Sequence, residues 1–277
     1  MGYKTIVVSL NDVDRAEVVL NAATLIATRQ EAHLIGLYVI PAVQVYPAIA
    51  MQITPEIMDS QRQFYEDRAS EVKALFDKVT SAAGISAEWH QMDSQGSIIA
   101  DAVIAYARNV DLVVAGQVDP DGEAMVEVDM IERLLLESGR PVLVIPSAGK
   151  FDEIGQEVTV AWNAKREASR AVFDALPLLK QSKKTTILCV NPDEDEDGIA
   201  GTEIATTLAR HGVNVEVQRS VVRDISVGDE ILARISDSGS DLVVMGGYGK
   251  SRMREFLFGG ASRDILHHMT VPVLISH

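Results

Sequence analysis

Short runs of β-branched and aliphatic residues alternate with longer amphipathic stretches along the whole chain. The apolar runs are continuous, which is typical of strands buried on both faces of a sheet. Apolar residues at helical spacing predict helices at residues 14–30, 56–83, 97–108, 165–180, 198–210 and 227–238. Strands that alternate with helices, without hairpin signals, predict a parallel α/β sheet with helices on both faces.

The pattern occurs twice. Four apolar runs recur in the same order: 6–11, 37–41, 111–116 and 141–145 match 158–163, 188–192, 241–246 and 272–275. We therefore predict two domains, residues 1–147 and 151–277, each a doubly wound sheet of five parallel strands. We expect them to pair through their final strands, Pro141–Ile145 and Pro272–Ile275, because an exposed edge strand favours aggregation. A homodimer of the tandem stays open.

The first half contains one insertion that the second half lacks. The offset between matching runs falls from about 151 residues to about 130, so the first half has some twenty extra residues between Pro41 and Asp111. The apolar segment Val43–Pro55 is the obvious candidate. We expect residues Val43–Ser60 to be mobile or lid-like, because Pro47 and Pro55 interrupt any helix.

The amino-acid composition and net charge disfavour some classes of binding partner. The 277 residues carry 25 Lys and Arg against 40 Asp and Glu, a formal charge of −15, and 47% are apolar. Such a chain repels nucleic acid and anionic lipid surfaces. It has no apolar stretch near the roughly 20 residues that span a bilayer, and its one cysteine, Cys189, lies in an apolar run. We expect a cytoplasmic protein with neither nucleic acid nor membrane as partner.

A glycine pattern follows the fourth strand of the second half. Gly246 and Gly249 let backbone N–H groups approach an anion, and Gly259-Gly260 opens a helix whose first N–H groups favour a phosphate. The loop from 246 to 263 carries a local charge of +3. A P-loop is excluded, because the glycine it needs five residues before Gly249 is Val244. A solvated glycine-bearing turn is the alternative interpretation.

This spacing, Gly246-x-x-Gly249 and then nine residues to Gly259 before a closing Pro-Val-Leu strand, resembles the universal stress protein family in its tandem two-domain form. The resemblance covers both halves. It implies a fold like that of the adenine nucleotide alpha hydrolases, a nucleotide site in some members, domain pairing through the last strands, and a role in stress survival.

Carried over residue by residue, the resemblance implies that the second half binds ATP or a related adenine nucleotide, with or without Mg²⁺. Two residues depart from the family pattern: Asn163 stands where an aspartate is usual, and Gly260 where a serine or threonine is usual. Asparagine still hydrogen-bonds a base or ribose, and Gly260 keeps its N–H. The implied contacts are Ala161, Asn163 and Val190 on the adenine side, and Met245, Gly246, Gly249, Gly259, Gly260 and Ala261 on the phosphate side.

The corresponding loop of the first half is acidic. Asp119 holds the second glycine position and Asp129 lies where the third glycine is expected. Carboxylates repel phosphate in a partly dehydrated pocket. We therefore expect the first half to bind no nucleotide, and the chain to bind one.

Other candidates are weaker. The acidic run Asp193–Asp197 could hold Mg²⁺, but a solvated loop is the simpler interpretation. Trp162 could lie near a base, although a core position is favoured, and His211, His267 and His268 lack partners at metal-ligand spacing. The chain has no catalytic motif, so binding is favoured over catalysis, with slow ATP hydrolysis left open. The alternatives are an adaptor with a vestigial site and a binder of an apolar ligand in the first half.

Overall fold

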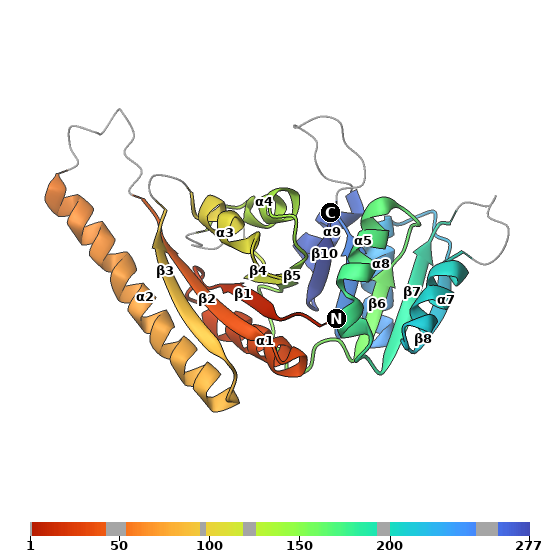
Figure 1. The fold of residues 1–277 in the computed structure, drawn as a ribbon. Helices are drawn as coiled ribbons and strands as arrows, with labels where there is room; N and C mark the ends of the chain where they lie inside the picture. The colour runs from red at the N-terminus through yellow and green to blue at the C-terminus, as the bar shows by residue number, and fades with distance from the viewer. Residues whose placement is uncertain (1, 43–53, 95–97, 119–125, 193–199, 248–259) are drawn as a thin grey trace. The chain divides into compact units, whose positions relative to one another are not determined.

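The computed structural model describes residues 2–42, 54–94, 98–118, 126–192, 200–247 and 260–277 (Figure 1). The chain divides into two compact units, Tyr3–Arg140 and Pro141–His277. Among the described residues, no helix is both long enough and apolar enough to cross a bilayer.

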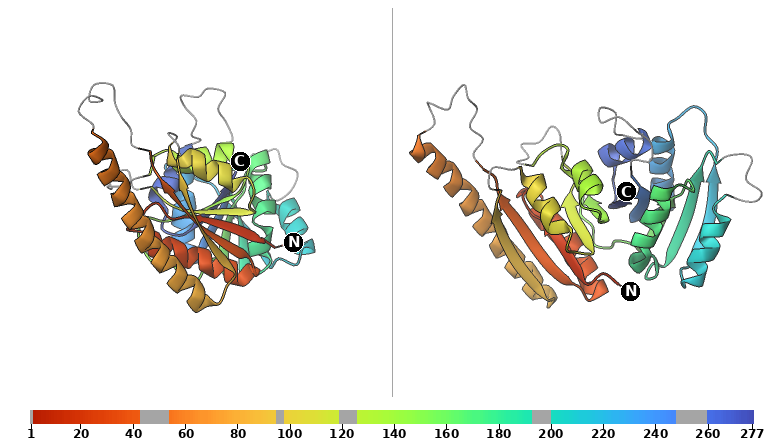
Figure 2. Two further views of the ribbon diagram at one scale, coloured as in Figure 1. Left: turned by 60° about the vertical axis from the view of Figure 1, so that its left-hand side comes forward. Right: turned by 45° about the horizontal axis from the view of Figure 1, so that its top comes forward.

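The first unit is a four-stranded parallel sheet in the order β3-β2-β1-β4. Helices α1 and α2 pack together on one face, and α3 and α4 on the other (Figures 1 and 2). The side chains between these layers are aliphatic and fully buried, as the continuous apolar runs predict. The elements are β1 (Thr5–Ser9), α1 (Ala16–Gln30), β2 (His33–Ile40), α2 (Pro55–Ala83), β3 (Ala87–Asp93), α3 (Ile99–Ala107), β4 (Leu112–Gly116) and α4 (Met130–Glu137).

The second unit repeats this order of elements and has six strands, in the order β5-β10-β9-β6-β7-β8. Figure 1 shows α5 and α7 in front of this sheet and α8 behind it. The elements are β5 (Val142–Ile145), β6 (Glu157–Ala161), α5 (Arg166–Asp174), α6 (Leu176–Leu179), β7 (Lys184–Val190), α7 (Thr202–Arg210), β8 (Val215–Ser220), α8 (Val227–Ser238), β9 (Leu242–Gly246), α9 (Gly260–His268) and β10 (Val273–Ser276).

The last strand of the first repeat, β5, lies in the sheet of the second unit. It runs antiparallel to β10, with Leu143 opposite Leu274. The predicted pairing of the final strands is therefore confirmed, whereas the prediction of two separate five-stranded parallel sheets is wrong. The physical reason is the edge of β10, whose unpaired backbone groups β5 covers.

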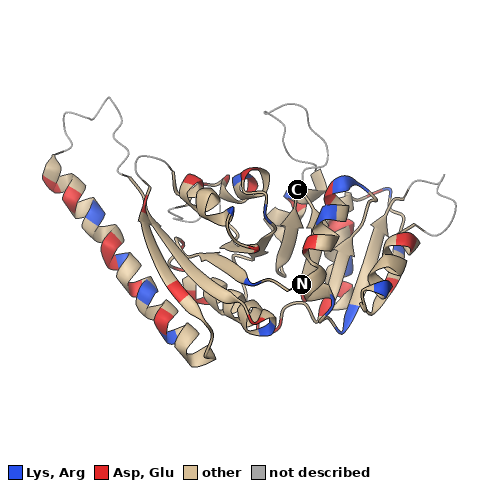
Figure 3. Ribbon diagram, viewed as in Figure 1, with Lys and Arg blue, Asp and Glu red and all other residues tan. Residues whose placement is uncertain are grey.

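The insertion of the first half is helical. Helix α2 has 29 residues, whereas its counterpart α7 has nine. Pro55 does not interrupt this helix, because it lies in the first turn. Backbone N–H groups of the first turn make no hydrogen bond within the helix, so the missing N–H of proline costs nothing there. Residues 55–60 of the predicted lid are thus the start of α2, while 43–53 lie outside the described residues. Acidic and basic residues alternate along α2 (Figure 3).

An aspartate directly precedes the fourth strand of each repeat, and the structure explains why it recurs. The Asp111 carboxylate accepts hydrogen bonds from the backbone nitrogens of Lys4 (2.7 Å) and Thr5 (3.0 Å). Asp241 does the same in the second unit for the backbone nitrogens of Gly155 (2.8 Å) and Glu157 (3.1 Å). Each carboxylate satisfies N–H groups at the start of a central strand, so the repeated aspartate serves the fold.

Candidate nucleotide site

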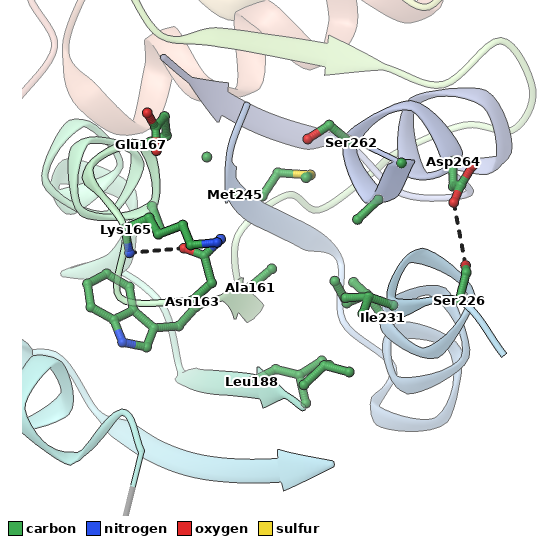
Figure 4. Close-up of a pocket in the computed structure, with 17 residues that line it drawn as sticks. Ala161, Asn163, Lys165, Glu167, Leu188, Ser226, Ile231, Met245, Ser262 and Asp264 are labelled. Carbon is green, nitrogen blue, oxygen red and sulfur yellow. Dashed lines mark hydrogen bonds between the residues drawn. The ribbon is translucent and has the colours of Figure 1, made fainter. Parts of the chain in front are cut away.

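A pocket of about 450 Å³ opens at the carboxyl ends of β6, β7 and β9 (Figure 4). The first turns of α5, α8 and α9 complete its wall. Carboxyl ends of parallel strands are where doubly wound sheets bind ligands, and the volume suits a small molecule. The lining residues are Ala161, Trp162, Asn163, Lys165, Glu167, Ala168, Leu188, Val190, Ser226, Val227, Ile231, Met245, Gly246, Gly260, Ala261, Ser262 and Asp264.

The structure brings the described residues of the predicted site together in this one pocket. They are Ala161, Asn163, Val190, Met245, Gly246, Gly260 and Ala261. Gly249, Gly259 and the basic residues Lys250, Arg252 and Arg254 lie outside the described residues. Segments about 100 residues apart in sequence thus converge at one sheet edge, as the repeat pattern predicts.

The pocket has an apolar side and a polar side. Leu188, Val190 and Ile231 belong to an apolar wall that suits the flat face of a base. On the other side, α9 begins at Gly260, and the N–H groups of its first turn have no partner within the helix. Such a terminus favours a phosphate.

Gly246 has a structural task that the sequence did not reveal. A Cβ at this position would lie 2.4 Å from the backbone nitrogen of Ala168 and 2.4 Å from the carbonyl carbon of Glu167. The first turn of α5 therefore packs directly on Gly246. The interpretation that this glycine only clears space for an anion is incomplete, because it also allows α5 to approach β9.

Gly260 lacks the hydroxyl of the serine or threonine that is usual at this position, but a serine nearby supplies one to the pocket. Ser262, in the first turn of α9, is buried and its side chain lines the pocket. The sequence interpretation missed Ser262, although a serine two residues into a helix that follows a glycine pair was the available signal. A Cβ at Gly260 would meet no atom of the described residues within 4 Å.

The two asparagines that the repeat aligns have different environments. Asn11 is buried, donates from Nδ2 to the carbonyl oxygen of Val39 (2.6 Å) and accepts from the Val39 nitrogen (3.1 Å). Asn163 is exposed on the pocket wall, and its Oδ1 accepts from the Lys165 nitrogen (3.1 Å). Asn11 therefore holds β1 to β2, whereas Asn163 faces the pocket.

Trp162 is not a core residue. It is half-buried and lines the pocket, because β6 ends at Ala161 and the chain turns there toward α5. Lys165 and Glu167 add charges of opposite sign at the same rim. None of these three was predicted as a contact.

A buried carboxylate positions α8, whose first turn lines the pocket. Glu230 accepts hydrogen bonds from the hydroxyl of Ser220 and from Nε of Arg234 (2.7 Å). The Ser220 hydroxyl, and then Arg234, hold the pKa of Glu230 below its usual value. This contact ties the start of α8 to the end of β8.

At the same edge of the first unit, the residues that the structure describes line a much smaller space. The pocket there, between Asp12 and Met130, measures about 20 Å³, room for a water molecule. Glu127 lies nearby in the chain, and its carboxylate accepts from the backbone nitrogens of Ile99 (2.7 Å) and Ala100 (3.3 Å) at the start of α3. Burial raises the pKa of the Asp12 carboxyl at this edge. The lack of a nucleotide in this half stays a prediction.

The acidic run Asp193–Asp197 lies outside the described residues. Among the residues that the structure describes, no group of three or more His, Cys, Asp or Glu side chains is arranged to hold a metal ion. For the apolar-ligand alternative, the structure offers a shallow surface depression on α2, lined by Ile57 and Phe64, at the start of that helix.

Residues 156–277 match the sequence profile of the Universal stress protein family. These residues, nearly the whole second half of the chain, therefore form a domain of this family. Comparison with curated proteins gives no match. The universal stress protein profile thus covers β6 to β10 and every residue of the pocket.

Solved structures extend the fold of this universal stress protein to the whole chain. A universal stress protein from Archaeoglobus fulgidus DSM 4304 is 19% identical, covers 98% of this chain and 95% of its own, and superimposes with a TM-score of 0.74. A functionally unknown protein from Pseudomonas aeruginosa PAO1 is 16% identical, covers 99% of this chain and 92% of its own, with a TM-score of 0.61. The first half therefore has the same α/β fold.

Another Archaeoglobus fulgidus universal stress protein was solved in complex with dAMP. It is 20% identical and covers 52% of this chain and 98% of its own, with a TM-score of 0.36. At that score the likeness supports no conclusion about this chain.

Proposed function

We propose that the second half binds one adenine nucleotide, ATP or a close relative, and that the protein acts as a nucleotide-dependent regulator of the stress response. The observation that supports this most is the convergence of Ala161, Asn163, Val190 and the α9 N-terminus around one pocket of about 450 Å³. A base fits the apolar wall while a phosphate lies at the helix start.

The net negative charge of the chain means that an anionic ligand needs a local source of attraction. At −15 the protein repels a nucleotide at long range, so binding depends on backbone N–H groups and on the helix dipole. The basic residues Lys250, Arg252 and Arg254 belong to the loop that leads into α9, where they would attract the anion.

Calorimetric titration of the full chain with ATP tests the proposal. We expect one equivalent per chain. Ala261→Asp places a carboxylate in the first turn of α9, on the pocket wall, and is expected to abolish binding. His267→Asp is the matched control, because His267 is exposed near the other end of the same helix and does not line the pocket.

The other outcomes separate the alternatives. Two equivalents in the wild-type protein would show that the acidic first half binds as well. No heat with ATP, ADP or AMP, from a protein whose circular dichroism shows it folded, would reject the proposal and favour an adaptor with a vestigial site. Equal loss in both variants would mean that charge alone, not the pocket, controls binding.

A further inference from the structure

A carboxylate lies in the wall of the pocket that we assign to an anionic ligand. Asp264, in the second turn of α9, lines the pocket beside Ser226 of the α8 N-cap (Figure 4). No ion pair joins Asp264 to any residue that the structure describes. A carboxylate without such a partner repels phosphate, so this part of the wall suits a different part of the ligand.

The hydrogen-bond geometry leaves Asp264 able to accept. The Ser226 hydroxyl lies 2.9 Å from Oδ2 of Asp229 and 3.4 Å from Oδ2 of Asp264. A hydroxyl has one proton, so the shorter contact to Asp229 takes it for most of the time. Asp264 thus retains acceptor capacity on the pocket wall, where a ligand hydroxyl can reach it.

The position of Asp264 is set by close packing. A Cβ at Gly228, in the first turn of α8, would lie 2.8 Å from the Asp264 Cβ. The two helices therefore approach each other closely at this point, which places the carboxylate between two regions of the pocket. On one side is the start of α9 with Gly260 and Ser262, and on the other is the apolar wall that includes Ile231.

A nucleotide has the matching order of parts. Its phosphate is placed at the helix start, its base against the apolar wall, and its ribose between them. We infer that Asp264 accepts a hydrogen bond from a ribose hydroxyl and makes the pocket select ribonucleotides over deoxyribonucleotides. This inference rests on the proposed nucleotide function. A site built to accept a hydroxyl proton rejects the analogue that lacks the hydroxyl.

Calorimetry with ATP, 2′-deoxy-ATP and 3′-deoxy-ATP tests the inference on the full chain. We expect the wild-type protein to bind at least one deoxy analogue about tenfold more weakly than ATP. In Asp264→Ala this preference is expected to fall to about one, and in Asp264→Asn, which keeps a neutral acceptor, to an intermediate value.

Asp237→Ala is the matched control. Asp237 is an exposed aspartate of α8 that does not line the pocket, so this variant should keep the full preference. A merely structural role of Asp264 would weaken all three nucleotides alike and leave their ratio unchanged, which would overturn the inference. Equal wild-type affinity for ATP and both analogues would also overturn it while leaving the proposed function intact. Failure of the wild-type protein to bind any of the three would reject both.

Discussion

Replacing Gly246 by alanine tests whether the glycine after β9 is required by packing. The new Cβ would lie 2.4 Å from two backbone atoms of α5, the Ala168 nitrogen and the Glu167 carbonyl carbon. The matched variant is Gly116→Ala at the end of β4, where the Cβ would lie 3.3 Å from Cγ2 of Val19. Neither glycine has a positive φ, so alanine is compatible with both backbones.

The two sites differ in what must move. At 246 the contacting atoms belong to the backbone, so the first turn of α5 has to shift by about 1 Å to reach ordinary contact distance. Overpacking of this kind costs about 3 kcal/mol. At 116 the contact is with one side-chain methyl of Val19 at 3.3 Å, which has to move by only a few tenths of an ångström. The lower entropy of the unfolded alanine chain, about 0.4–1 kcal/mol, offsets it, leaving a change near zero.

Urea unfolding measures both changes, because each unit contains one of the two tryptophans. Trp162 reports on the second unit in a Trp89→Phe background, and Trp89 reports on the first in a Trp162→Phe background. We expect Gly246→Ala to lower the free energy of unfolding by at least 2 kcal/mol more than Gly116→Ala does. A difference below about 0.5 kcal/mol would refute the argument and leave Gly246 with a role in the loop alone.

Three further variants follow from the same geometry. Gly260→Ser adds a hydroxyl where a Cβ meets no atom of the described residues within 4 Å, so calorimetry should show ATP bound severalfold more tightly, and unchanged affinity would count against a phosphate at the start of α9. Glu230→Gln should destabilise the second unit at neutral pH. Because the pKa of Glu230 is lowered in the folded state, its ionisation stabilises the fold at pH values above 4.5, the ordinary pKa, and this stability is lost as the pH falls through the folded-state pKa. The free energies of unfolding of wild type and variant, measured with urea at several pH values, should therefore converge in acid. A difference that does not change with pH would disprove the contribution. Tyr38→Phe removes a fully buried hydroxyl that has no hydrogen-bond partner among the described residues and whose pKa burial raises to about 12, so thermal unfolding should show equal or greater stability; a lower Tm would reveal a partner such as a bound water.

The chain's pattern was sufficient to predict the repeat, the parallel α/β class and six helices, because both faces of the central strands are covered by apolar layers. It did not locate β3 and β8. Burial alternates along β3, and β8 carries polar residues that are only partly buried. Both are edge strands, so they lack the continuous apolar run that marks the others.

The sequence predicted the edge of the sheet where the candidate site lies, and the family resemblance supplied its residues. Ala161 and Val190 end their strands and Met245 directly precedes the end of β9, so these three lie at that edge. Ser226 and Asp264 were not predictable in this way. They come from helices whose distance from the strands depends on packing, and no local pattern encodes that distance.

Tertiary structure alone decided three matters. It placed β5 in the compact unit of the second repeat, whereas the sequence predicted only that β5 and β10 pair. It also revealed why Gly246 cannot carry a side chain, since the obstacle is the backbone of α5. Finally, it separated Asn11 from Asn163, one bonded to β2 and one on a pocket wall. Sequence determines which residues occupy equivalent places in a repeat, but the neighbours that give each residue its chemistry come from packing.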